Sequence, residues 1–263
     1  MDQHARTARE LASKFQSTSR QLDACFVRAI GVGDLVTSDG AREHLKYGVG
    51  RRFGILRKDL EYIGGVASPY RAETLTADEN TLFDLHLNSL YLHVRGSLDN
   101  LAWCLAHEFE ILGPVPHGDS RFRRRIGLFL SEFRSAFPGD LADSRDLRDR
   151  LDDWHRDLTN IRDPVAHRIP LYAVPAVLNR EEAERYKALA EEVNVAISSF
   201  NPERANRLME EQGRLGRYLP VFAHSFREDP IPRPILPSVC EDLGHVCDIA
   251  TCIFDSLEKR GAA

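Results

Sequence analysis

The sequence predicts an all-α protein built as an antiparallel helical bundle with additional C-terminal helices. Two observations lead to this class. Apolar residues recur at spacings of three and four in several long segments, which is the period of an amphipathic helix. No stretch shows the sustained alternation of apolar and polar residues that a half-buried strand requires.

Composition is typical of a globular chain, with 263 residues, 43% of them hydrophobic and 29% charged. No run of apolar residues is long enough to cross a membrane. The N-terminal segment "MDQHARTARELASKF" lacks the apolar core of a signal peptide. We therefore expect a cytoplasmic protein without a membrane partner.

Residues 1–70 are predicted as a helix followed by a loop region. Residues 31–54 are rich in glycine and are assigned to the loop, and a short helix follows around Ile55–Ile63. The first helix carries its apolar residues on one face: Leu11, Phe15, Leu22, Phe26 and Ile30.

Residues 71–178 are predicted to form the helical core. Thr76 and Glu79 form a capping box at the start of a helix over Ala77–Glu110, which would be about 50 Å long. A second helix is predicted through Phe122, Ile126, Phe129, Phe133 and Phe137. A third begins near Ser144 and carries Leu147, Leu151, Trp154, Leu158 and Ile161.

Residues 179–263 are predicted as C-terminal helices packed on this core in one structural domain. Asn179 with Glu182, and Asn201 before Pro202, have the pattern of helix N-termini. The segment "REDPIPRPILP" is predicted to be an extended connector, and Ser238 with Glu241 to cap the last helix.

Charge and cysteine content exclude two classes of function. A net charge of −5 argues against a general duplex-DNA binder, whose affinity comes largely from basic side chains. Cys240, Cys247 and His245 lie close in sequence, but the two cysteines are seven residues apart, or about 10 Å along a helix. They cannot share a zinc ion from one straight helix, so we expect buried thiols and neither metal nor cofactor.

The segment "NIRDPVAHRIPLY", residues 160–172, is the main candidate for chemistry. Proline disfavours helical geometry in the residue before it, so the backbone is predicted to break at Pro164. Such a break could point Arg162 and His167 into one cleft. Alternatively, Asp163 and Pro164 only mark a helix boundary. Spacing alone does not decide, because Arg148-Asp149, with six residues between Arg148 and His155, passes the same loose filter as Arg162-Asp163, with four residues between Arg162 and His167.

Together with "HVRGSLDNLAW" on the preceding long helix, this segment resembles the HEPN superfamily of helical-bundle proteins over residues 76–172. The superfamily signature is an arginine, a polar residue and a histidine four to six residues after the arginine. It falls here on Arg162, Asp163 and His167. The proline after Asp163 departs from the commoner forms of the signature.

The resemblance implies a homodimeric, metal-independent endoribonuclease, a toxin or defence effector, with an antitoxin or nucleotidyltransferase as a further partner. His167 would transfer protons, and Arg162 would stabilise the charged phosphorane. Other members of the superfamily are inactive and bind RNA, nucleotides or proteins. Three hypotheses follow: a ribonuclease, a silent RNA- or nucleotide-binding relative, and a plain interaction protein.

Further residues are candidates for supporting roles. Arg95 and Asp99 are four apart and can pair, either on the surface or in the wall of the cleft. The cluster of Arg121, Arg123, Arg124 and Arg125 would supply RNA contacts if it is more than a solvated face. His86, His93, Asn100 and His107 recur every seven residues and are interpreted as a wetted face, with a polar seam as the alternative.

Overall fold

A computed structural model describes residues 3–71, 73–115, 120–167, 169–174, 176–224 and 232–261. The side chains of residues 3–5, 120, 162–164, 166 and 167 lie outside this description. The elements in chain order are α1 (Gln3–Leu35), α2 (Asp39–Glu43), the π-helix η1 (His44–Gly50), α3 (Arg51–Val66), α4 (Ala77–Glu108), α5 (Ser120–Arg123), α6 (Ser131–Ser135), α7 (Gly139–Ala142), α8 (Arg145–His167), β1 (Tyr172–Ala173), α9 (Arg180–Ser198), α10 (Pro202–Gly213), β2 (Val221–Ala223), β3 (Arg233–Pro234) and α11 (Ile235–Gly261).

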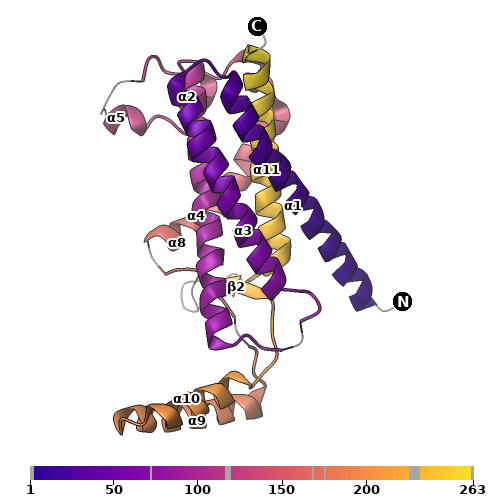
Figure 1. The fold of residues 1–263 in the computed structure, drawn as a ribbon, viewed down its shortest axis with the longest axis vertical. Coiled ribbons are helices and arrows are strands. Elements are labelled where there is room, and N and C mark those ends of the chain that lie inside the picture. Colours follow the sequence, from indigo (N-terminus) through magenta and orange to yellow (C-terminus); the bar gives the residue numbers. More distant parts are fainter. Residues whose placement is uncertain are drawn as a thin grey trace.

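The predicted all-α class is confirmed. Long helices α1, α3, α4, α8 and α11 pack side by side as a bundle (Figure 1). α3 and α4 are antiparallel, because Arg52 contacts His93 and Asp59 contacts His86. α1 and α11 instead run parallel, with Thr18 at Cys240 and Cys25 at Cys247. α8 is antiparallel to α11, because Trp154 contacts Asp242 and Arg150 contacts Asp248. The long helices thus alternate in direction along the chain, which leaves the first and the last of them parallel.

Local sequence signals fix several helix ends as predicted. Thr76 and Glu79 form the capping box of α4, and Asn179 and Glu182 form that of α9. Pro202 occupies the first turn of α10 behind Asn201. Each side-chain cap satisfies backbone N–H groups that have no partner inside the helix.

The prediction of a glycine-rich loop over 31–54 is wrong. α1 continues to Leu35, and α2, η1 and α3 follow one another from Asp39 to Val66. Gly31 has nothing within 4 Å of an added Cβ, but Gly33 and Gly48 lie where helices approach closely: a Cβ at Gly33 would collide with the Lys46 side chain, and one at Gly48 with Asn100. Close packing, rather than a turn, explains Gly33 and Gly48.

Two other predicted helices differ in the structure. The segment through Phe122 and Phe137 forms the short helices α5 and α6 joined by turns, not one helix. α11 starts at Ile235, so Ser238 is a buried residue of its first turn and does not cap it. Pro237 is accommodated there because a first-turn N–H needs no helical partner.

The predicted C-terminal region 179–263 divides into two parts. α11 lies in the bundle, whereas α9 and α10 form a hairpin that lies beyond the bundle's end (Figure 1). We call this hairpin, residues 180–213, the arm. Strands β1, β2 and β3 form a small antiparallel sheet at its base, in the order β1-β2-β3.

Candidate functional site

The predicted break at Pro164 is absent, because α8 continues as a helix to His167. Pro164 lacks the N–H that would bond to the carbonyl of Asn160, yet the helix does not end there. Val165 packs against the hydrophobic core and anchors the last turn. Arg162 and His167 are thus helical residues about 7.5 Å apart along the axis. Their side chains, and that of Asp163, lie outside the described residues.

Two polar residues of α4 hold the chain that leaves the end of α8. The Asn88 side chain accepts the Leu171 N–H at 2.8 Å and donates to the Leu171 carbonyl at 2.7 Å. Asp84 accepts the Ala173 N–H at 2.7 Å. Burial raises the pKa of Asp84 to about 6. These contacts fix the motif-bearing end of α8 beside the first half of α4.

Arg95 and Asp99 form the predicted ion pair, with 3.1 Å between nitrogen and oxygen. The Arg95 guanidinium also lies over the Phe129 ring, which in turn stacks on His155 at 4.4 Å. His155 precedes Arg162 by seven residues, or about 10 Å along α8. The pair therefore supports the middle of α8, about two turns before the motif.

The predicted arginine cluster does not form one helix face. Arg121 and Arg123 belong to α5, and Arg124 and Arg125 lie in the turn that follows. Arg125 pairs with Glu132, while Arg123 and Arg124 are exposed. α5 projects to the side of the bundle (Figure 1). These arginines therefore form a separate basic surface.

The position of that surface along α8 follows from two ion pairs of α6, the first of which joins Glu132 to Arg125 of the cluster. Arg134 of α6 contacts Asp152 of α8 at 2.6 Å. Asp152 lies ten residues, or about 15 Å, before Arg162. A ligand that contacts both the cluster and the motif would have to extend along α8.

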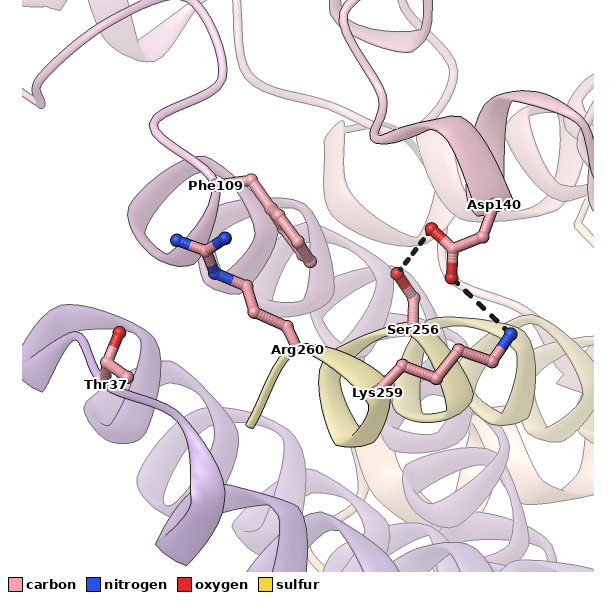
Figure 2. A pocket seen from close by; sticks show the side chains of 6 residues that line it. All are labelled: Thr37, Phe109, Asp140, Ser256, Lys259 and Arg260. Carbon is pink, nitrogen blue, oxygen red and sulfur yellow. Dashed lines mark hydrogen bonds and ion pairs between the residues drawn. The ribbon is translucent and has the colours of Figure 1, made fainter. Parts of the chain in front are cut away.

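A pocket of about 460 Å³ lies near the end of α11 (Figure 2). Its polar groups satisfy one another. Ser256 donates to Asp140 at 3.0 Å, and Lys259 pairs with the same carboxylate at 3.7 Å. The Arg260 guanidinium lies over the Phe109 ring. Arg260 is also 3.6 Å from the Glu108 carboxylate, so each charged side chain drawn in Figure 2 has an oppositely charged partner.

Buried Glu108 lies beside this pocket and has a structural role. Its carboxylate accepts the backbone N–H groups of Thr37 and Ser38 and the Thr37 hydroxyl, at 2.9 to 3.1 Å. It therefore ties the end of α4 to the turn between α1 and α2.

The histidine row on α4 is a seam within the bundle and not a wetted face. His86 contacts Asp59, His93 contacts Arg52, and Asn100 contacts His44. All four members of the row are half-buried against η1, α2 and α3. Burial lowers the pKa of His93, and Arg52 lowers it further. A second pocket opens in this seam.

Sequence reasoning missed a buried carboxylate at Asp242. It accepts the Tyr91 hydroxyl and the Trp154 indole N–H, both at 2.7 Å, and Arg233 lies 3.9 Å away. Burial raises its pKa. The sequence did contain a signal for this site: Asp242 lies on the apolar side of the last predicted helix, directly before Leu243, where a charged residue is unexpected.

Comparisons of this chain with protein-family models, with curated proteins and with solved structures find no match. Among the described residues, no group of three or more His, Cys, Asp or Glu side chains is placed to hold a metal ion. The described cysteines are free thiols. No helix in the described ranges combines the length and apolar character needed to cross a bilayer.

Proposed function

We propose that this protein is a metal-independent endoribonuclease of HEPN type, with Arg162 and His167 as its catalytic residues. The observation that carries the proposal is the position of this pair. Both residues lie in the last two turns of α8, in an all-α bundle, and α4 holds the chain just beyond them through Asn88 and Asp84.

The chemistry explains why these two residue types are needed. The 2′-hydroxyl of RNA attacks the adjacent phosphorus, the new O2′–P bond forms, and the P–O5′ bond breaks. His167 transfers a proton at the attacking or leaving oxygen, and Arg162 stabilises the charge on the phosphorane. The products are a 2′,3′-cyclic phosphate and a 5′-hydroxyl.

The proposal includes a homodimer and RNA contacts outside the motif. α8 contacts α4 and α11 on its buried side, and its outer residues around Asp153 and Asp157 are exposed. These aspartates repel phosphate, so RNA would approach the motif end of α8 and the exposed Arg123 and Arg124. Two motifs, one from each protomer, would face a shared cleft.

Cleavage by the purified protein in EDTA tests the proposal, using a pool of structured and unstructured RNAs. Arg162→Ala and His167→Ala should each abolish the cyclic-phosphate products. Arg148→Ala is the matched control, because Arg148, like Arg162, directly precedes an aspartate in α8, and the next histidine, His155, follows after seven residues rather than five. Activity that is lost equally in all three variants, or that requires a metal, would contradict the assignment.

Absence of cleavage with retained RNA binding would favour a catalytically silent relative. In that case the basic surface still predicts a salt effect. Replacing Arg123 and Arg124 by glutamine should weaken RNA binding and flatten its dependence on salt concentration, since each lost phosphate contact lowers the slope by about one. If the salt dependence of RNA binding were unchanged, it would count against both the ribonuclease and the silent RNA-binding relative.

A further inference from the structure

A pocket of about 410 Å³ opens between η1, the first turn of α3 and α4. This volume is within the range of about 300 to 1,000 Å³ that is typical of small-molecule sites. Its lining includes His44, Tyr47, Arg51, Arg52, His93 and Asn100. His93 and Arg95 are about 200° apart around α4, so the pocket and the residues that face α8 lie on different sides of that helix.

Two adjacent arginines, Arg51 and Arg52, and one glutamate, Glu43, line the pocket, so its lining carries a net positive charge. Neither Arg51 nor Arg52 has an acidic group at ion-pair distance within the described residues, and Glu43 is the one acidic residue among those that line the pocket. Arg57, on the same helix, pairs with Asp23 instead. Arg51 lies with its guanidinium over the Tyr47 ring, at 4.8 Å.

Arg52 is held in a fixed position. Its guanidinium donates to His93 Nδ1 at 3.1 Å and lies directly against Gly96, where any Cβ would collide with it. Because His93 accepts through Nδ1, its ring proton is on Nε2. The lowered pKa of His93 keeps this ring neutral near pH 7. A guanidinium fixed in this way loses little freedom when it binds an anion.

His44 is oriented by a second set of contacts. Asn100 donates through Nδ2 to the Gly96 carbonyl at 2.8 Å, which turns its Oδ1 toward His44 Nδ1 at 3.0 Å. His44 also stacks on Trp103, with 5.5 Å between ring centroids. The imidazole is therefore held by contacts on two sides.

The backbone of this wall is itself unusual. Residues His44–Gly50 form a π-helix, a rare conformation that often occurs at functional sites. Gly48 allows it to approach Asn100 closely. The pocket thus combines fixed polar side chains, a net positive charge and a rare backbone conformation.

We propose that this seam pocket binds a small phosphate monoester. Arg51 and Arg52 would form charge-assisted hydrogen bonds to the phosphate oxygens, which suit the planar fork of a guanidinium. The exposed Tyr47 ring would contact the rest of the ligand. The site does not include the α8 motif, so it is independent of the proposed ribonuclease activity.

Isothermal titration of the full chain tests the site with inorganic phosphate, glycerol 3-phosphate, ribose 5-phosphate and a mononucleotide. At least one phosphate monoester should bind more tightly than ribose without phosphate. Arg51→Gln and Arg52→Gln should each weaken that binding by about tenfold or more, as expected for the loss of a hydrogen bond to a charged group. The order of affinities among the four probes identifies the source of the phosphate.

Arg207→Gln is the matched control, because it removes one positive charge from an exposed position on α10. It should leave binding unchanged. Arg51 is exposed and has no structural hydrogen bond among the described contacts, so Arg51→Gln should fold and should cleave RNA as the unaltered chain does. No phosphate binding below about 10 mM, or equal binding by all variants, would overturn the proposal.

Discussion

Asp242 shows how a single buried carboxylate can join three parts of the bundle. It belongs to α11 and receives hydrogen bonds from Tyr91 of α4 and Trp154 of α8. A buried polar group without such partners would cost free energy of about 1 to 3 kcal/mol. The network therefore fixes how these helices meet as well as satisfying the carboxylate.

We predict that Tyr91→Phe lowers the free energy of unfolding by about 1 to 3 kcal/mol, because it removes the donor and keeps the ring. Tyr70→Phe is the control, since Tyr70 is 67% exposed and should change stability by less than about 0.5 kcal/mol. Urea denaturation measures both. Equal effects of the two substitutions would show that the hydrogen bond to Asp242 contributes nothing.

Asp84 makes stability depend on pH in a defined direction. Its folded pKa of about 6 lies above the ordinary 3.8, so the folded state binds more protons between these values. The contribution of Asp84 is thus most favourable at low pH and is lost as the pH rises through about 6. Asp84→Asn keeps an acceptor for the Ala173 N–H but cannot titrate.

The stability of Asp84→Asn relative to the unaltered chain should therefore increase from about pH 4 to about pH 6 and then level off. Urea midpoints of both proteins across this range measure the difference. Because both proteins contain the same other carboxylates, the effect of their titration cancels in the difference between the two stabilities. A constant difference would show that Asp84 has an ordinary pKa in the folded chain.

The contact between η1 and α4 depends on a glycine. We predict that Gly48→Ala destabilises the fold by about 1 to 3 kcal/mol, because the new Cβ would displace Asn100 and its hydrogen bond to His44. Gly65→Ala, at an exposed helical position with nothing within 4 Å, should be neutral or slightly stabilising. Thermal unfolding of the Gly48→Ala and Gly65→Ala variants separates the cost of the close contact at Gly48 from the effect that any glycine-to-alanine change has in a helix.

An element was predicted correctly where the interactions that fix its ends lie close together in the sequence. Capping residues at Thr76 and Asn179 act within one turn, and the sequence was sufficient to place them. Glycine content suggested a loop at 31–54, although Leu45, Val49 and Phe53 are buried at helical spacing. That spacing was the better signal, because a glycine at a helix contact cannot be told from a loop glycine by composition.

The remaining differences have tertiary causes. Phe122 and Phe133 are both buried at helical spacing, but they reach the interior from two short helices. The pocket between η1 and α4 joins residues more than 40 positions apart, such as Arg52 and His93. The spacing of residues along α4 places His93 on one face of that helix, but it cannot identify which residues of another helix pack against that face. The same limit applies to Arg162 and His167, whose role depends on what faces the end of α8.

Across the whole molecule, stability is distributed unevenly between the bundle and the arm. The interior of the arm contains few buried side chains, namely Leu189, Val193, Ala196 and Ala205. At its tip Phe200 is 95% exposed and adopts a positive φ of 50°, which is strained for a bulky residue. In the described ranges its helices pack chiefly against each other.

We predict that backbone amides of α9 and α10 exchange with solvent faster than those in the buried middle of α4 and α11, because the arm can open without unfolding the bundle. Hydrogen–deuterium exchange followed by mass spectrometry resolves these segments. Equal protection in a dilute sample would mean that the arm opens only together with the bundle.

The arm also leaves and rejoins the bundle at one place. Val174 donates to the Val221 carbonyl, and Val177 and Arg217 exchange two backbone hydrogen bonds, so the outgoing and returning chains form a ribbon. In topological terms the arm is an insertion between α8 and α11. A short turn joining residues 177 and 217 would close the ribbon without altering the order or direction of any bundle helix. This segment is therefore the part of the molecule that can lengthen, shorten or be lost while the rest keeps its fold.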